Sequence, residues 1–206
     1  MTNSFAAKPC FARFRGKARE RRKMFIGDDD DADSQRFKLE LEGENELVIL
    51  GLNPSTARGM SKNFPKEKTC DDNTIKRIKG FSERAWNVPE LKLNGFLMLN
   101  ICAQSTSDSE TLAEDSALHE KNKQKIESYL ADKANPVVLL AYGDAVSEKK
   151  FPFLKTYLKE IVEIFKKHGA TFYHLGDLTK EGNPRHPLFL PYNTPFNSMG
   201  ENKIAQ

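Results

Sequence analysis

The sequence predicts a three-layer α/β/α domain built around a mainly parallel central sheet. Continuous apolar runs recur along the chain, and such runs are typical of strands that are covered on both faces. Segments with helical periodicity lie between these runs, and this alternation favours right-handed crossovers between parallel strands. The chain has 206 residues, of which 38% are hydrophobic, so it is long enough to form one domain with its own core.

Five segments are expected to form strands. Residues 37–42 alternate between apolar and polar side chains, which predicts an antiparallel strand at an edge of the sheet. Residues 171–175 form a shorter strand late in the chain. Three continuous apolar runs are expected to be buried parallel strands: residues 46–51, 95–100 and 136–143.

Three segments have the spacing of helices. Residues 72–86 carry apolar side chains at every third or fourth position, and Asp71 or Asp72 can cap the start of this helix. Residues 117–131 predict a polar helix, and residues 153–167 predict an amphipathic helix. The helices and strands alternate along the chain, as the α/β class requires.

A single domain is expected over residues 36–195, between an N-terminal extension (1–35) and a C-terminal tail (196–206). The extension is either part of the domain or flexible, and arginine and lysine side chains form a basic run between Arg13 and Lys23. Such a run can bind the phosphates of a nucleic acid or nucleotide. It can equally be a solvated surface, since the net charge is only +3.

The composition and the motifs argue against several classes of protein. No apolar run approaches the roughly 20 residues of a membrane helix, and no export signal is visible, so a cytoplasmic protein is expected. Cys10, Cys70 and Cys102 are widely spaced, which argues against a disulfide framework. The histidines lack zinc-ligand spacing, and His119 and His168 lie in polar segments where solvent is expected to surround them. Glycine motifs for phosphate or dinucleotide binding are absent, so neither a metal nor a cofactor is expected.

Polar residues follow the predicted strands at the points where these strands end. Ligands of open α/β sheets bind beyond the carboxyl ends of the strands, so these residues are candidates for one site. Asn53 and His186 are the candidate catalytic residues. The candidate substrate-binding residues are Gly51, Leu52, Pro54, Ser55, Asp71, Asp72, Thr74, Asn100, Gln104, Gly143, Arg185 and Pro187.

Three of these residues combine useful chemistry with a restricted position. Asn53 lies between a glycine and a proline, so its amide is either held rigidly to orient a water or forms an Asx turn. Asn100 ends an apolar strand, and its partly buried amide needs partners that a nucleobase edge or a local turn can provide. His186 lies in a polar loop, and the proline that follows restricts its backbone to extended geometry.

Asp71 and Asp72 allow a different interpretation of the site. Paired carboxylates can perform acid–base chemistry when burial separates their pKa values, and they can equally cap the helix that follows. A hydrolase that uses Asp71 or Asp72, with a divalent metal, is therefore an alternative.

Between Cys10 and Leu190 the chain resembles an uncharacterised bacterial and phage family, the domain of unknown function 1643. The shared motifs are LNPSTA at residues 52–57, DDNTI at residues 71–75 and a segment at residues 178–188 that ends in RHPL. This resemblance brings no established activity.

The chain is also similar, more remotely, to the uracil-DNA glycosylase superfamily. Members of that superfamily place a Gly-x-Asp/Asn-Pro motif after the first core strand and an asparagine after a second apolar strand. A glycine after a later strand and a His-Pro loop follow. Residues 51–54, Asn100, Gly143 and residues 186–187 repeat this order. The resemblance implies a uracil-DNA glycosylase-like fold.

The same resemblance implies roles for three residues. Asn53 would orient the attacking water, Asn100 would read the Watson–Crick edge of an extruded base, and His186 would hydrogen-bond the base carbonyl. Leu188 departs from the pattern, because those glycosylases usually have serine after His-Pro. The expected function is a glycosylase-like hydrolase that cleaves an N-glycosidic bond in DNA or a nucleotide. The alternative is a non-catalytic nucleotide or nucleic-acid binding protein with the same fold.

Overall fold

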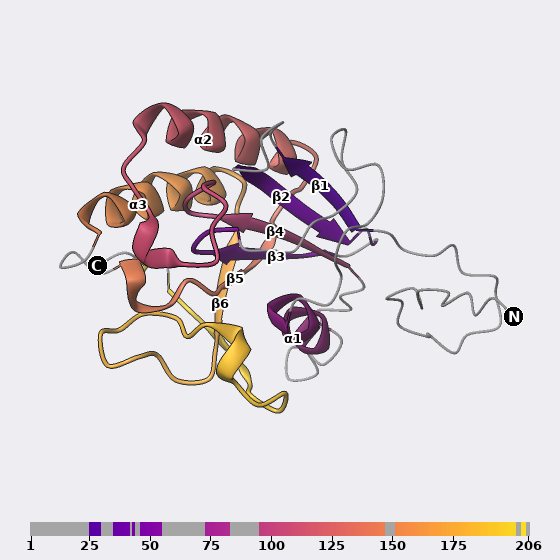
Figure 1. Cartoon of the computed structure of the whole chain (residues 1–206). Coiled ribbons are helices and arrows are strands. Elements are labelled where there is room, and N and C mark those ends of the chain that lie inside the picture. Colours follow the sequence, from indigo (N-terminus) through magenta and orange to yellow (C-terminus); the bar gives the residue numbers. More distant parts are fainter. Residues whose placement is uncertain are drawn as a thin grey trace, which may run out of the picture.

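The computed structural model describes residues 25–29, 35–41, 43, 46–54, 73–82, 95–146, 151–200 and 203–204. In this part of the chain one mixed sheet has the strand order β1-β2-β4-β3-β5-β6-β7 (Figure 1). The strands are β1 (Phe25–Asp29), β2 (Arg36–Leu41), β3 (Glu46–Gly51), β4 (Gly95–Asn100), β5 (Val137–Leu140), β6 (Thr171–Leu175) and β7 (Phe196–Ser198). The α-helices are α1 (Asn73–Ser82), α2 (Ser116–Leu130) and α3 (Pro152–Lys167).

The sheet changes direction at both edges. The strands in its middle, β4, β3, β5 and β6, pair in parallel. The pairings of β1 with β2, β2 with β4 and β6 with β7 are antiparallel. The α/β class is therefore confirmed, but the sheet as a whole is mixed rather than mainly parallel. Parallel neighbours need a crossover connection of a dozen or more residues, and the short connection between β1 and β2 has no room for one.

Helices cover both faces of the sheet, with α2 and α3 on one face and α1 on the other (Figure 1). In β3, Val48 and Leu50 pack in the cluster beneath α2 and α3, whereas Leu47 and Ile49 pack in the cluster beneath α1. All four side chains are 0% exposed. This burial on both faces explains why the central strands have unbroken apolar sequences.

The sheet extends beyond residues 36–195 at both ends of the chain. β1 pairs with β2, so the strand that was expected at the edge has a neighbour on each side. β7 pairs with β6, and Phe196, Met199 and Ile204 are buried, so the segment expected as a tail contributes to the core.

The basic run between Arg13 and Lys23 lies outside the described residues. None of the described helices is long and apolar enough to cross a membrane.

His119 is buried between α2 and α3, and the expectation that solvent surrounds it is wrong. Its ring stacks on Tyr157 with the ring centroids 3.6 Å apart, and its Nε2 lies 3.2 Å from Oε2 of Glu160. A polar helix still buries one face, and on α2 the histidine lies on that face. Burial lowers the pKa of His119, and the hydrogen bond to Glu160 partly offsets this effect.

We expect the unfolding temperature to fall as the pH is lowered from about 8 to about 5. Burial lowers the pKa values of His119 and His174 in the folded chain. The unfolded chain therefore binds more protons below the ordinary value of about 6.5, so stability present above that pH is lost as the pH falls through the lowered values. His119→Gln removes one of the two groups and should make the fall smaller. Equal falls in the variant and the wild type, measured by thermal unfolding, would contradict this expectation.

Candidate functional site

The ends of three strands and a late loop enclose one cavity. β3 and β4 end in register at Gly51 and Asn100, and β2 begins on the other side of β4 because it runs antiparallel to that strand. This position, at the carboxyl ends of parallel strands, is where α/β sheets bind ligands. The cavity has a volume of about 390 Å³, and its described lining residues are Arg36, Gly51, Leu52, Asn53, Thr74, Ile75, Met98, Thr106, Ser107, Ser109, Tyr142, His186, Leu188 and Phe189.

The structure brings six of the predicted site residues together at this cavity. Asn100 is 1% exposed, and its Oδ1 would lie 2.9 Å from a Cβ placed on Gly51, so its amide packs directly against the lining. The other five line the cavity themselves: Gly51, Leu52, Asn53, Thr74 and His186.

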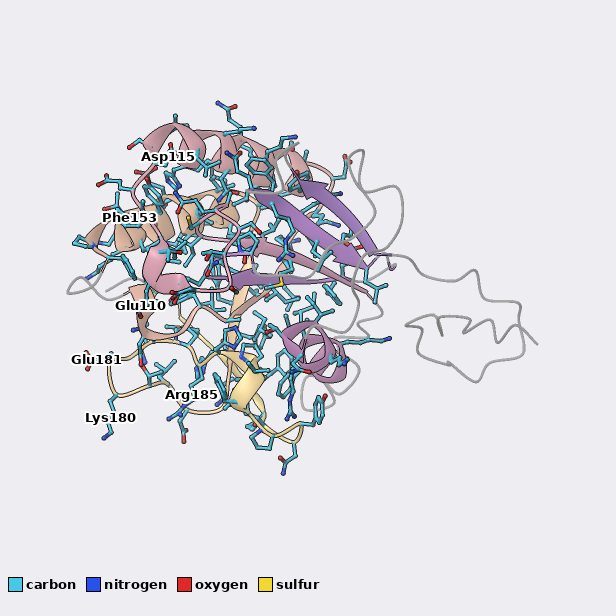
Figure 2. All side chains as sticks on the ribbon, in the orientation of Figure 1. Glu110, Asp115, Phe153, Lys180, Glu181 and Arg185 are labelled. Atoms are coloured by element: carbon cyan, nitrogen blue, oxygen red, sulfur yellow. The ribbon has the colours of Figure 1, made fainter. Side chains whose placement is uncertain are left out.

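Two predicted residues support the surrounding loops instead of lining the cavity. Gln104 exchanges hydrogen bonds with the backbone of Ala113: its Nε2 donates at 3.0 Å and its Oε1 accepts at 3.1 Å. Arg185, labelled in Figure 2, has an exposed side chain, and its Nε donates to the carbonyl of Asp177 at 2.9 Å. Both side chains satisfy backbone groups of irregular segments, which need partners as much as a ligand does.

Other predicted residues fix turns next to the cavity. Gly143 has a φ of 70°, a conformation that favours glycine, and its N–H donates to the carbonyl of Pro184 at 3.0 Å. Pro54 is buried, and Pro187 begins the short helical turn η3 (Pro187–Phe189). The remaining predicted residues, Ser55, Asp71 and Asp72, lie outside the described part of the chain.

The Asn53 amide ties the loop after β3 to the loop after β4. Its Nδ2 donates to the carbonyls of Pro54 and Thr106, both at 2.9 Å, and the Thr106 N–H donates back to Pro54 at 3.0 Å. Both Nδ2 protons are used in this way, so the orientation of the amide is fixed. Oδ1 accepts no hydrogen bond from the described residues, and it is therefore the atom that Asn53 can offer to a water or a ligand.

Asn100 carries a buried amide without a hydrogen-bond partner in the described part of the chain. Neither Oδ1 nor Nδ2 has a hydrogen-bond partner among the described residues. Side chains alternate along a strand, so Asn100 lies on the same face as Met98, which lines the cavity. A buried polar group left unsatisfied costs about 1–3 kcal/mol. A ligand that both donates and accepts hydrogen bonds would remove this cost.

His186 has extended backbone, with φ −70° and ψ 131°. Its Nδ1 accepts a hydrogen bond from the N–H of Leu188 at 3.3 Å. In the neutral ring the proton is therefore on Nε2, which makes that atom a donor. The ring centroid lies 6.3 Å from that of Phe189, which also lines the cavity and is 83% exposed, so this loop forms part of the rim.

Comparison with known proteins decides the family. The family model described as "Protein of unknown function (DUF1643)" matches residues 36–188. The chain belongs to this family. No curated protein and no solved structure matches the chain. The relationship to uracil-DNA glycosylases therefore stays a prediction. The region matched to DUF1643 begins at Arg36 and ends at Leu188, and both residues line the cavity.

Two buried lining residues of this DUF1643 chain were not expected from the sequence. Arg36 is 2% exposed and Tyr142 is 3% exposed. Arg36 begins an alternating strand, where a charged residue is typical of a solvated position, and Tyr142 ends an apolar run, where it is typical of a core. Burial raises the pKa of the Tyr142 hydroxyl, which therefore stays protonated and can donate a hydrogen bond.

The described residues offer neither a metal centre nor a reactive thiol. No group of three metal-ligating side chains occurs among them. Cys102 is buried, and burial raises the pKa of its thiol to about 11, so the nucleophilic thiolate is scarce at neutral pH. The polar side chains among the described lining residues carry amide, hydroxyl, imidazole and guanidinium groups.

Gly51→Ala is expected to lower, several-fold, the affinity for any ligand that hydrogen-bonds to Asn100. The new Cβ would lie 2.9 Å from Oδ1 of Asn100 and 3.1 Å from Cε of Met98, closer than ordinary contacts, so these side chains must move. Calorimetric titration with a nucleobase measures the effect. Gly200→Ala is the matched control, because an added Cβ there meets nothing within 4 Å. Unchanged affinity in Gly51→Ala would show that ligands do not depend on Asn100.

Proposed function

We propose that the cavity binds a nucleobase and that the protein is a glycosylase-like hydrolase, cleaving an N-glycosidic bond in DNA or a nucleotide. The observation that carries this proposal is the buried amide of Asn100, which has no hydrogen-bond partner among the described residues and lies beside a cavity that Asn53 and His186 line. The volume of about 390 Å³ lies within the range of roughly 300–1,000 Å³ that is usual for small-molecule sites.

Asn100 is suited to recognising the edge of a base. An amide presents a donor and an acceptor side by side, and the Watson–Crick edge of a base presents the same two kinds of group. Because neither atom of the amide has a partner among the described residues, binding a base there removes an existing cost rather than breaking an internal hydrogen bond.

Asn53 is suited to positioning the attacking water, and His186 is suited to stabilising the leaving base. Oδ1 of Asn53, held in place through Nδ2, would accept a hydrogen bond from a water and orient it towards the sugar carbon of the N-glycosidic bond. The water oxygen bonds to that carbon as the bond to the base breaks, and the electron pair leaves with the base. Nε2–H of His186 would donate to the base carbonyl, where negative charge develops, and the water proton is finally taken up by the base or solvent.

The uracil-DNA glycosylase-like relationship is part of this proposal. Its support is that three motifs, predicted in order along the chain, meet at one cavity in the fold. Leu188 replaces the serine that is usual after His-Pro in those enzymes, and here it lines the cavity. An apolar side chain at that position provides no hydroxyl for a phosphate, so phosphate contacts must come from other residues.

Base release from oligonucleotides tests the proposed function. Duplex and single-stranded substrates containing uracil, hydroxymethyluracil or a mismatch are incubated with the purified protein, and free base is quantified by chromatography. The proposal expects release of at least one base, with His186→Ala reducing the rate. Release from none of these substrates would contradict the glycosylase reaction, and a chelator-sensitive release would favour a metal-assisted reaction at Asp71 or Asp72.

The second candidate function is that of a non-catalytic nucleotide-binding protein. The side-chain hydrogen bonds of Asn53 favour this candidate. Nδ2 of Asn53 donates to Pro54 within the loop after β3 and to Thr106 in the loop after β4, so one of the two hydrogen bonds joins the loops, which a binding protein also needs. This candidate expects nucleotides to raise the unfolding temperature without any turnover. Turnover would exclude it.

A further inference from the structure

The described lining residues of the cavity carry a cationic side chain and several hydrogen-bond donors. Among its described residues no carboxylate is present, and Arg36 supplies a permanent positive charge. Hydroxyl groups come from Thr74, Ser107, Ser109 and Tyr142. Donors and positive charge without carboxylates suit a ligand that carries negative charge and many acceptors.

Arg36 is placed at the cavity by the backbone of β2. Its N–H donates to the carbonyl of Ala103 at 3.0 Å, which fixes the start of β2 beside the segment after β4. The side chain is one of the largest fully buried ones in the described chain. A guanidinium stays protonated when it is buried, and its attraction for an anion is stronger there than at a solvated surface.

The cavity spans more of the sheet edge than a single base ring needs. The strand order β2-β4-β3-β5 places Arg36, Asn100, Gly51 and Tyr142 on four successive strands or their ends. Neighbouring strands lie about 4.8 Å apart, so this row extends over roughly 14 Å. An isolated base fills part of such a row, whereas a nucleotide has further groups to place along it.

We propose that the cavity takes a nucleotide together with its phosphate, and that Arg36 is the residue that contacts this phosphate. Ser107 and Ser109, from the loop after β4, add hydroxyl donors of the kind that bind phosphate oxygens. The inference deepens the proposed function and rests on it for the base. A free mononucleotide and the phosphate of a nucleic-acid strand share this chemistry.

Isothermal titration calorimetry compares uracil, uridine and uridine 5′-monophosphate, and then the matching guanine series. The monophosphate is expected to bind about tenfold to a hundredfold more tightly than its nucleoside, and this advantage should shrink as salt is added. Inorganic phosphate should compete with the monophosphate. Equal affinities of nucleoside and monophosphate in both series, or no binding of any compound, would overturn the inference.

Arg36→Met removes the charge at similar volume and is expected to abolish the phosphate advantage while leaving the affinity for the nucleoside. Lys38→Met is the matched control, since Lys38 lies on the same strand but its Nζ bonds to Glu40 at 2.7 Å and lies 5.0 Å from the centre of the Tyr129 ring. The control should keep the full advantage. If Arg36→Met does not fold, Arg36→Lys is used instead and should lower the advantage only in part. A loss of the same size in Lys38→Met would attribute the effect to net charge and overturn the role of Arg36.

The results of the binding and base-release experiments together separate this inference from the proposed function. A phosphate advantage without base release supports the inference and contradicts the glycosylase reaction. Base release with equal affinity for nucleoside and monophosphate supports the reaction and overturns the inference. Oligonucleotides with and without a 5′-phosphate identify the source of the phosphate, because only a strand-end site prefers the phosphorylated strand over the mononucleotide.

Discussion

Replacing Asn100 by alanine is expected to weaken nucleobase binding about tenfold to a hundredfold without destabilising the fold. A base that satisfies the Asn100 amide makes two hydrogen bonds, each of which contributes about 0.5–1.5 kcal/mol. Both polar atoms of this side chain lack partners among the described residues, so their removal breaks no hydrogen bond within that part of the chain. Calorimetric titration measures the affinity, and urea denaturation measures the free energy of unfolding, which should stay within about 1 kcal/mol of the wild type.

Asn122→Ala provides the matched control for Asn100→Ala. Asn122 is also an asparagine with 1% exposure, but its Nδ2 donates to the carbonyls of Asn100 at 3.0 Å and Ile101 at 3.3 Å. Its removal leaves two buried carbonyls without these donors and is expected to cost about 1–3 kcal/mol of stability. Asn122 does not line the cavity, so the variant should keep most of its affinity for a base.

The two asparagine variants should therefore give opposite results. Asn100→Ala should lose affinity for a base and keep the stability of the fold. Asn122→Ala should lose stability and keep most of its affinity for a base. If Asn100→Ala loses as much stability as Asn122→Ala and still binds bases with wild-type affinity, Asn100 is a structural brace and the proposed base site is wrong.

The parts of the fold that follow from local patterns could be predicted from the sequence. The β3 segment has an unbroken apolar sequence because Leu47 and Val48 face different helix layers, and this two-sided burial is visible without coordinates. The antiparallel edges were harder to predict. β7 has only three residues, and its pairing with β6 depends on a long connection that has no helical or strand periodicity.

The candidate site could be predicted where chemistry and strand ends coincide. Asn53, Asn100 and His186 were expected together because each follows or faces the end of a strand. Gln104 satisfies this criterion too, yet its amide pairs with the backbone of Ala113, since loop amides and carbonyls compete with ligands for polar side chains. Arg36 was missed because its position depends on the pairing between β2 and β4, a contact between segments that are far apart in the sequence.

Replacing Asn53 by alanine is expected to slow base release roughly a hundredfold to ten-thousandfold, the usual range for the loss of a group that positions a reacting water or proton. Of the two polar side-chain atoms of Asn53, Nδ2 bonds to the loop backbone and Oδ1 accepts no hydrogen bond from the described residues, so the substitution removes the acceptor that would orient the water. Single-turnover kinetics on the preferred oligonucleotide measure the chemical step. Base affinity should change little, because Asn100 and His186 remain.

The same substitution also removes two hydrogen bonds to the loop backbone, one within the loop after β3 and one to the loop after β4, so a control must separate this effect from the loss of the water site. Gln104→Ala is matched to it, because that amide also braces the loop after β4 with two hydrogen bonds but does not line the cavity. Both variants should lose about 1–3 kcal/mol of stability, whereas only Asn53→Ala should lose the rate. Equal rates in the two variants would mean that Asn53 acts as a loop brace alone, and the attacking water would then need another acceptor in the cavity.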